Sequence, residues 1–218
     1  MPGKSRLVYT LYYSPGTASL AVHLALLEIG VTHRLERVDF AVDAQHRPEY
    51  LRLNPRGQVP TLLIDGEPYF ESAALIMVLA ERHPEARLAP APGSERRAAW
   101  YQWMAFLASA LGPAFRLWFY PSDLGSDAHP PAVRQALQQK IESAWALVDA
   151  QLAAHGPYLL GAEISGVDLV ALMYMRWSRN MPRPATAWPA LREYAALMRS
   201  RPSWRRLCEI EGLTEWAV

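Results

Sequence analysis

Hydroxyl side chains surround a Pro-Gly turn near the start of the sequence, where they could activate a thiol. Ser14 precedes Pro15-Gly16, and Thr17 and Ser19 follow it at the start of an expected helix. A thiol with a pKa of about 8.5 is only slightly ionised at neutral pH, although the thiolate is the nucleophile. Lowering that pKa by about two units requires roughly 2.7 kcal/mol. A hydroxyl hydrogen bond to the thiolate supplies about 1.5–3 kcal/mol and a helix N-terminus about 0.3–1 kcal/mol.

We expect Thr17 to be the hydroxyl that donates to such a thiolate, with Ser19 and then Ser14 as the next candidates. Either Thr17 or Ser19 can instead cap the helix, and for this pair we expect one cap and one donor. The phenol of Tyr13 is a further candidate, and packing of a strand tyrosine under the turn is its alternative role. This chemistry requires neither a metal ion nor a cysteine of the protein.

The elements expected around this turn form a small α/β unit in the order βαβαββα. Strands are expected over residues 7–12, 32–38, 61–64 and 67–70, and Asp65-Gly66 predicts a type I′ turn between the last two. Helices are expected from Leu20 to Gly30, from Pro48 to residue 53, and from a Ser72 cap to His83.

The composition changes at the stiff linker Ala89-Pro90-Ala91-Pro92-Gly93, after which only helical patterns follow. These helices are expected over residues 94–118 and 132–154, from a Ser165/Asp168 capping box toward residue 179, and from Pro189 and Pro202. We therefore expect an N-terminal domain over residues 1–86, a linker over 87–93 and an all-helical domain over 94–218.

Composition also limits the partners of the protein. The net charge of +1 over 218 residues gives no long-range attraction to nucleic acid or acidic membranes. The apolar run over residues 103–115 is too short to cross a membrane, and the single Cys208 cannot form an internal disulfide. We expect a cytoplasmic protein, and we interpret Asp123, Asp127 and His129 as a solvated loop rather than a metal site.

Several motifs occur in a characteristic order. They are Tyr12-Tyr13-Ser14-Pro15-Gly16, Asn54-Pro55-Arg56-Gly57-Gln58-Val59-Pro60, Glu71-Ser72 and the Ser165/Asp168 cap. With a thioredoxin-like βαβαββα unit, a Pro-rich linker and an all-helical second domain, they make nearly the whole chain resemble a cytosolic glutathione S-transferase, nearest to the bacterial beta class. The chain departs from that class at Ala18, which replaces its site cysteine, and at Gly112, which replaces its site histidine. Thr17 matches the position of the catalytic serine in theta- and delta-like classes.

The resemblance implies a glutathione site in the N-terminal domain. The Val59-Pro60 bond is cis in the family, which leaves the N–H and C=O of Val59 free to pair with the backbone of the tripeptide. Ser72 and its N–H offer an anion site for the γ-glutamyl carboxylate. Glu71 can accept from the neighbouring ammonium group, and Gln58 completes the polar pocket. Arg56 or His46 can meet the glycine carboxylate, and solvation is the alternative for both.

The resemblance also implies the reaction, in which glutathione thiolate is conjugated to a small apolar electrophile without any further cofactor. The electrophile is expected between the domains, where Phe115, Trp118 and Phe119 could line a pocket, with core packing as their alternative role. A homodimer that acts in detoxification is expected from the family. The alternatives are a glutathione-dependent peroxidase, dehalogenase or isomerase, and a non-catalytic adaptor with the same fold.

Overall fold

The computed structural model describes residues 8–216, which form two compact units. The first unit holds the chain up to Ala86 together with the C-terminal helix α9 (Pro202–Glu211), and the second holds Arg87–Ser200. This differs from the predicted division, which placed the whole C-terminal segment in the helical domain. The difference arises because α9 packs against α1 (Ser19–Ile29) of the first unit.

The described residues of the first unit form a four-stranded sheet in the order β2-β1-β3-β4. Its strands are β1 (Tyr9–Tyr13), β2 (His33–Arg37), β3 (Thr61–Ile64) and β4 (Glu67–Phe70). β1 runs parallel to β2 and antiparallel to β3, and β3 is antiparallel to β4. The predicted first strand began at Leu7, which lies outside the described residues.

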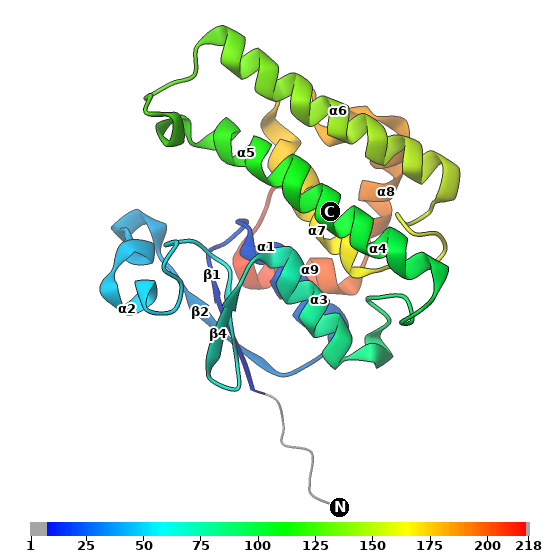
Figure 1. The fold of residues 1–218 in the computed structure, drawn as a ribbon, viewed down its shortest axis with the longest axis horizontal. Helices are drawn as coiled ribbons and strands as arrows, with labels where there is room; N and C mark the ends of the chain where they lie inside the picture. Colours follow the sequence, from blue (N-terminus) through cyan, green and yellow to red (C-terminus); the bar gives the residue numbers. More distant parts are fainter. Residues whose placement is uncertain (1–7, 217–218) are drawn as a thin grey trace, which may run out of the picture. The chain divides into compact units, whose positions relative to one another are not determined.

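Helices cover this sheet and complete the predicted order βαβαββα. They are α1, α2 (Pro48–Leu51) and α3 (Ser72–Arg82). Figure 1 shows α1, α3 and α9 gathered on one side of the sheet and α2 on the other. The thioredoxin-like α/β fold expected for the first part of the chain is thus confirmed.

Local signals account for the ends of these elements. Gly30 ends α1 with a φ of 75°, and its N–H donates to the carbonyl of Leu26. Asp65 and Gly66 have φ angles of 54° and 96°, as a type I′ turn requires, and they join β3 to β4. The predicted hairpin and the predicted end of the first helix are both confirmed.

The second unit is helical, as predicted. Its helices are α4 (Glu95–Phe106), α5 (Gly112–Phe119), α6 (Pro131–His155), α7 (Gly166–Trp177) and α8 (Pro189–Arg199). Short 3₁₀ turns occur in the two units at Phe40–Val42, Ala44–His46, Pro84–Ala86, Pro121–Leu124, Ser178–Asn180 and Ala185–Ala187. None of the helices within residues 8–216 is long and apolar enough to cross a membrane.

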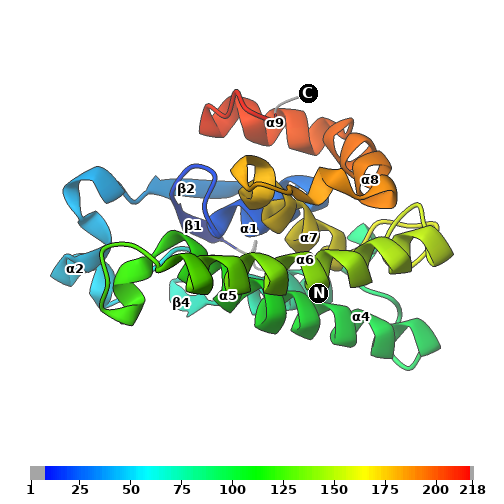
Figure 2. The same cartoon turned by 90° about the horizontal axis from the view of Figure 1, so that it is seen from above.

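One predicted helix, over residues 94–118, is divided in the structure. α4 and α5 follow one another along nearly the same line in both views (Figure 1, Figure 2), and the π-helical segment Leu107–Leu111 joins them. Pro113 lacks the N–H that would continue the α-helical ladder. The preceding residue, Gly112, donates to the carbonyl of Leu107, five residues back. The prediction missed this change of hydrogen-bond period.

The capping box predicted at the start of α7 is confirmed. The Ser165 N–H donates to Asp168 Oδ2 at 2.7 Å, and the Ser165 hydroxyl donates to the same oxygen at 3.0 Å. The other carboxylate oxygen of Asp168 accepts from the Leu159 N–H at 3.0 Å and from the Tyr194 hydroxyl at 3.0 Å. The buried Asp168 therefore connects the start of α7 both to α8 and to the loop that precedes α7.

Candidate functional site

Segments that lie far apart in the sequence meet at one end of the sheet in the first unit. The register pairs Tyr12 with Thr61, so the chain that follows β1 lies beside the chain that precedes β3. The Ser72 hydroxyl donates to the carbonyl of Ala18 at 2.8 Å, which brings the start of α3 to the start of α1. The residues predicted for thiol activation and for peptide binding therefore share one edge of the unit.

The hydroxyl turn, which we define as Ser14–Thr17, has the geometry expected of a type II turn. The Thr17 N–H donates to the Ser14 carbonyl at 3.3 Å, and Gly16 has the positive φ, 69°, that the third position of this turn requires. The Thr17 hydroxyl donates to the same carbonyl at 2.7 Å and lies 3.0 Å from the Ser19 hydroxyl. The turn thus holds the threonine hydroxyl beside the first residue of α1.

Ser19 lies behind Thr17 in this arrangement. Its side chain is fully buried, its hydroxyl donates to the Ser14 carbonyl at 3.1 Å, and it accepts from the Ser14 N–H at 3.2 Å. We expected one of Thr17 and Ser19 to cap α1. That prediction is wrong, because Ala18 is the N-cap of α1 and no side chain caps the helix. The Ser19 hydroxyl instead holds the hydroxyl turn from inside.

Two other candidate donors, Ser14 and Tyr13, have side-chain hydroxyls that make no hydrogen bond to the described residues. Neither the Ser14 hydroxyl nor the Tyr13 phenol has a hydrogen-bond partner within residues 8–216. Ser14 is 8% exposed, and the ring of Tyr13 packs 6.0 Å from that of His23. Thr17, Ser14 and Tyr13 therefore remain candidates for a bond to a ligand, whereas the buried Ser19 is less accessible.

The Val59-Pro60 bond is cis and belongs to a well-supported loop. The preceding carbonyl, that of Gln58, accepts from the Tyr50 hydroxyl at 2.6 Å and from the Asn54 side-chain amide at 2.8 Å. Burial raises the pKa of Tyr50, so that its phenol keeps the proton it donates. The N–H and C=O of Val59 have no backbone partner among the described residues, which leaves them available to an extended peptide.

Tyr50 and Asn54 are residues whose roles sequence reasoning missed. Tyr50 is 5% exposed and Asn54 is 2% exposed. Tyr50 also packs with Val38 and Val59 in a small apolar cluster beneath the loop. The only signal in the sequence was an asparagine directly before Pro55, whose side-chain amide needs a hydrogen-bond partner wherever it is buried. The partner itself, a carbonyl four residues on, could not be read from the sequence.

Glu71 and Ser72 begin α3 in an unusual conformation. Glu71 has a φ of 76°, a region that costs a non-glycine residue about 1–3 kcal/mol and that is enriched at binding sites. Glu71 is the N-cap but makes no side-chain cap bond, and Ser72 is the first helical residue. The prediction that Ser72 caps α3 is therefore wrong: its hydroxyl is used by Ala18, while its N–H stays at the positive end of the helix.

The candidates for a carboxylate partner are both paired on the protein surface. Arg56 forms an ion pair with Glu71, and both side chains are more than half exposed. His46 Nδ1 lies 2.8 Å from the Asp43 carboxylate. Exposed pairs of this kind contribute little to stability, so either side chain can exchange its partner for a ligand at low cost.

Gly57 is a position in this loop where a side chain would meet a neighbour. Its φ is 60°, and a Cβ there would lie 2.6 Å from Cδ2 of the His46 ring. We expect Gly57→Ala to destabilise the protein by about 1 kcal/mol more than Gly30→Ala, because Gly30 has a similar φ of 75° but open space around its Cβ position. Urea unfolding of both variants measures the difference; equal losses would contradict the predicted clash with His46.

The aromatic residues expected in an electrophile pocket differ in exposure. Phe115 is fully buried and stacks on Tyr174 at 5.8 Å, and Trp118 is 6% exposed. Their burial favours the core-packing alternative. Phe119 is 47% exposed and stays a candidate for ligand contact. Within residues 8–216, no group of His, Cys, Asp and Glu is arranged to hold a metal ion.

Comparison with known proteins gives consistent matches. A model described as glutathione S-transferase, N-terminal domain, matches residues 17–82, and one described as glutathione S-transferase, C-terminal domain, matches residues 131–197. A Xanthomonas campestris protein named glutathione S-transferase GST-4.5 is 29% identical over 93% of this chain and 98% of its own. An Escherichia coli protein named disulfide-bond oxidoreductase YfcG is 27% identical over 88% of this chain and 91% of its own.

Solved structures agree with these sequence matches. The structure of a sphingomonad glutathione S-transferase complexed with glutathione is 31% identical and has a TM-score of 0.83. The aligned region covers 94% of this chain and 100% of the sphingomonad chain. The family models fall one in each compact unit, and the first of them includes Thr17, the Val59-Pro60 bond and the start of α3.

Proposed function

Because this chain belongs to the glutathione S-transferase family, we propose that it binds glutathione at the edge of the first unit and transfers the glutathione thiolate to a small apolar electrophile. The observation that carries this proposal is the pair of unpartnered backbone groups on Val59, next to the cis Pro60 and beside the hydroxyl turn. An extended tripeptide can pair with both groups and direct its thiol to the start of α1.

The γ-glutamyl end of the tripeptide is assigned to the start of α3. The N–H of Ser72 lies at a helix N-terminus, where a carboxylate is stabilised. Glu71 carries the negative charge that an ammonium group needs, and Gln58 adds a polar side chain at the same edge. The glycine carboxylate is then left for His46, which lies beside Gly57, or for Arg56 when its ion pair with Glu71 opens.

The thiol is assigned to Thr17, whose hydroxyl can act in a short relay. Thr17 now donates to the Ser14 carbonyl, and Ser19 lies 3.0 Å from it. When the Thr17 hydroxyl turns to a thiolate, Ser19 can donate to Thr17 Oγ1, which strengthens the bond to sulfur. The Ser14 carbonyl keeps its bond from the Thr17 N–H in either arrangement.

The reaction proposed for this site is conjugation. The thiolate attacks the electrophilic carbon, a C–S bond forms, and an aryl chloride loses chloride. The exposed Phe119 is the pocket residue that this proposal retains. The family resemblance further implies a cytoplasmic homodimer that acts in detoxification.

One relative is named a disulfide-bond oxidoreductase, so an oxidoreductase is an alternative to the transferase. Disulfide exchange through a thiol of the protein itself is not favoured, because the single cysteine, Cys208, is buried in α9 at 5% exposure. A glutathione-dependent peroxidase, dehalogenase or isomerase would use the same tripeptide site. A non-catalytic adaptor would have no need of the unpaired groups on Val59.

Calorimetric titration tests the binding step. We expect millimolar glutathione to release or absorb heat on the full chain, and we expect cysteinylglycine, which lacks the γ-glutamyl group, to bind much more weakly. Turnover of 1-chloro-2,4-dinitrobenzene then tests conjugation. Absence of binding would contradict the whole proposal, while binding without turnover would favour one of the alternative reactions or the adaptor.

A further inference from the structure

A carboxylate from the C-terminal helix holds the backbone of the hydroxyl turn. Glu211 Oε2 accepts from the Gly16 N–H at 2.8 Å, across 195 residues of sequence. Glu211 Oε1 lies 2.7 Å from His23 Nδ1, and both side chains are fully buried. Gly16 is the third residue of the turn, and Thr17 follows it directly. Glu211 therefore holds the turn at the residue next to Thr17.

The place of this acid in its own helix is unfavourable. Glu211 is the last residue of α9, and Gly212 ends the helix with a φ of 66°. A negative charge at a helix C-terminus is opposed by the helix dipole, and burial adds a desolvation cost. His23 Nε2 is also buried without a hydrogen-bond partner among the described residues. A local arrangement that breaks several preferences at once is typical of a functional position.

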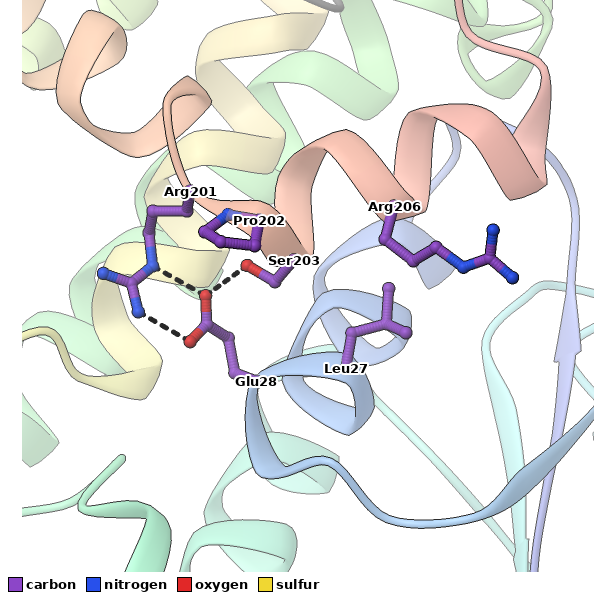
Figure 3. A pocket seen from close by; sticks show the side chains of 6 residues that line it. All are labelled: Leu27, Glu28, Arg201, Pro202, Ser203 and Arg206. Carbon is purple, nitrogen blue, oxygen red and sulfur yellow. Dashed lines mark hydrogen bonds and ion pairs between the residues drawn. The ribbon is translucent and has the colours of Figure 1, made fainter.

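A second acid, Glu28, binds the first residues of α9 and the residue before it, but it does not contact the hydroxyl turn. Glu28, near the end of α1, accepts from Arg201 at 2.7 Å and from the Ser203 hydroxyl, as Figure 3 shows. Burial alone would raise the pKa of Glu28, but its bonds from Arg201 and Ser203 outweigh that effect and lower it. These residues line a hollow of about 390 Å³, with Leu27, Pro202 and Arg206 around it. Glu28 and Glu211 therefore both fix α9, but only one of the two contacts the hydroxyl turn.

We propose that Glu211 is a positioning residue for the transferase reaction: it holds the Gly16 amide so that the hydroxyl turn presents Thr17 to the glutathione sulfur. This inference rests on the proposed function and extends it to the C-terminal helix. The type II turn leaves the amide of its third residue outside the turn's own hydrogen bond, so an external acceptor is what fixes it. A buried carboxylate gives a stronger and more directional bond than water would.

The test compares Glu211→Leu with Glu28→Leu as a matched control. We expect Glu211→Leu to lower kcat by about 10- to 100-fold and to raise the kinetic pKa of bound glutathione, because a displaced hydroxyl stabilises the thiolate less. Removal of a negative charge alone would lower that pKa, so the direction separates positioning from electrostatics. Glu28→Leu should lower the Tm while kcat and the kinetic pKa stay unchanged. Glu211→Gln, which keeps an acceptor for Gly16, should recover part of kcat.

Hydrogen exchange of the Gly16 amide gives a readout that does not need glutathione. We expect this amide to be protected in the wild-type chain and in Glu28→Leu, and to exchange faster in Glu211→Leu. A wild-type amide that exchanges at the unprotected rate would overturn the inference even if Glu211→Leu failed to fold. If the wild type is active and kcat falls equally in Glu211→Leu and Glu28→Leu, the inference about Glu211 is overturned while the proposed function stands. A wild type that neither binds nor turns over glutathione would remove the proposed function as well.

Discussion

Replacing Thr17 by alanine is expected to raise the kinetic pKa of bound glutathione by about one to two units and to lower kcat at neutral pH by about 10- to 100-fold. The reason is that a hydroxyl bond to a thiolate contributes about 1.5–3 kcal/mol, and one pKa unit corresponds to about 1.4 kcal/mol. Below the kinetic pKa the thiol is protonated, so the variant should lose rate most at low pH and recover it as the pH rises. The pH dependence of kcat with 1-chloro-2,4-dinitrobenzene measures the shift.

Thr17→Ser is the matched control for this prediction. Serine keeps the hydroxyl and loses only a methyl group, so its pH profile should stay close to that of the wild type. A Thr17→Ala profile identical to the wild type would contradict the assignment and transfer the role to Ser14 or Tyr13. Both have hydroxyls without a partner among the described residues. Ser19→Ala should have a smaller effect, because its buried hydroxyl acts on the sulfur indirectly, through Thr17 and through the two Ser14 backbone bonds that hold the turn.

The parts of the fold that were predictable are those with local causes. Asp65-Gly66 specifies its turn through two adjacent φ angles, and the Ser165/Asp168 box satisfies helix donors within three residues. Such signals are complete within a short window of sequence. For the same reason the Pro-Gly turn before α1 could be recognised, although the partners of its hydroxyls could not.

The parts that were not predictable depend on contacts between distant segments. Nothing in the sequence around Glu211 indicates that its carboxylate reaches Gly16, and nothing around Tyr50 indicates that its phenol reaches the Gln58 carbonyl. Ser72 was predicted as a cap on good local grounds, but its hydroxyl bonds to Ala18, 54 residues away. Tertiary contacts thus decide the use of each polar group at the site, while local sequence decides the elements that carry them.

Two segments from opposite ends of the chain explain why the candidate site belongs to one compact unit. The hydroxyl turn supplies the donors, and α9 supplies the acceptor that fixes the turn. A truncation before Pro202 should therefore damage the proposed chemistry even though it removes none of the residues predicted to contact glutathione. The role of α9 is accordingly local support of the first unit rather than extension of the helical domain.

The largest expected effect on stability belongs to Asp168, whose replacement by alanine should lower the free energy of unfolding by about 3–5 kcal/mol. The side chain is fully buried, and its carboxylate accepts from two backbone N–H groups and two hydroxyls. Alanine would leave the amides of Leu159 and Ser165 and the hydroxyl of Tyr194 buried without that acceptor. Burial raises the pKa of Tyr194 well above its ordinary value, and its phenol remains a proton donor. Urea unfolding monitored by tryptophan fluorescence measures the loss.

Asp149→Ala is the control that separates this network from an ordinary side-chain bond. Asp149 accepts a single backbone N–H, that of Leu191 at 3.0 Å, at the start of α8, so we expect a loss of only about 1 kcal/mol. Tyr194→Phe removes one donor from Asp168 and should fall between the two. Equal losses in Asp168→Ala and Asp149→Ala would show that the four bonds do not act together. The ordering of the three variants is therefore the decisive result, because it depends on how many hydrogen bonds each substitution removes: four for Asp168, two for the Tyr194 hydroxyl and one for Asp149.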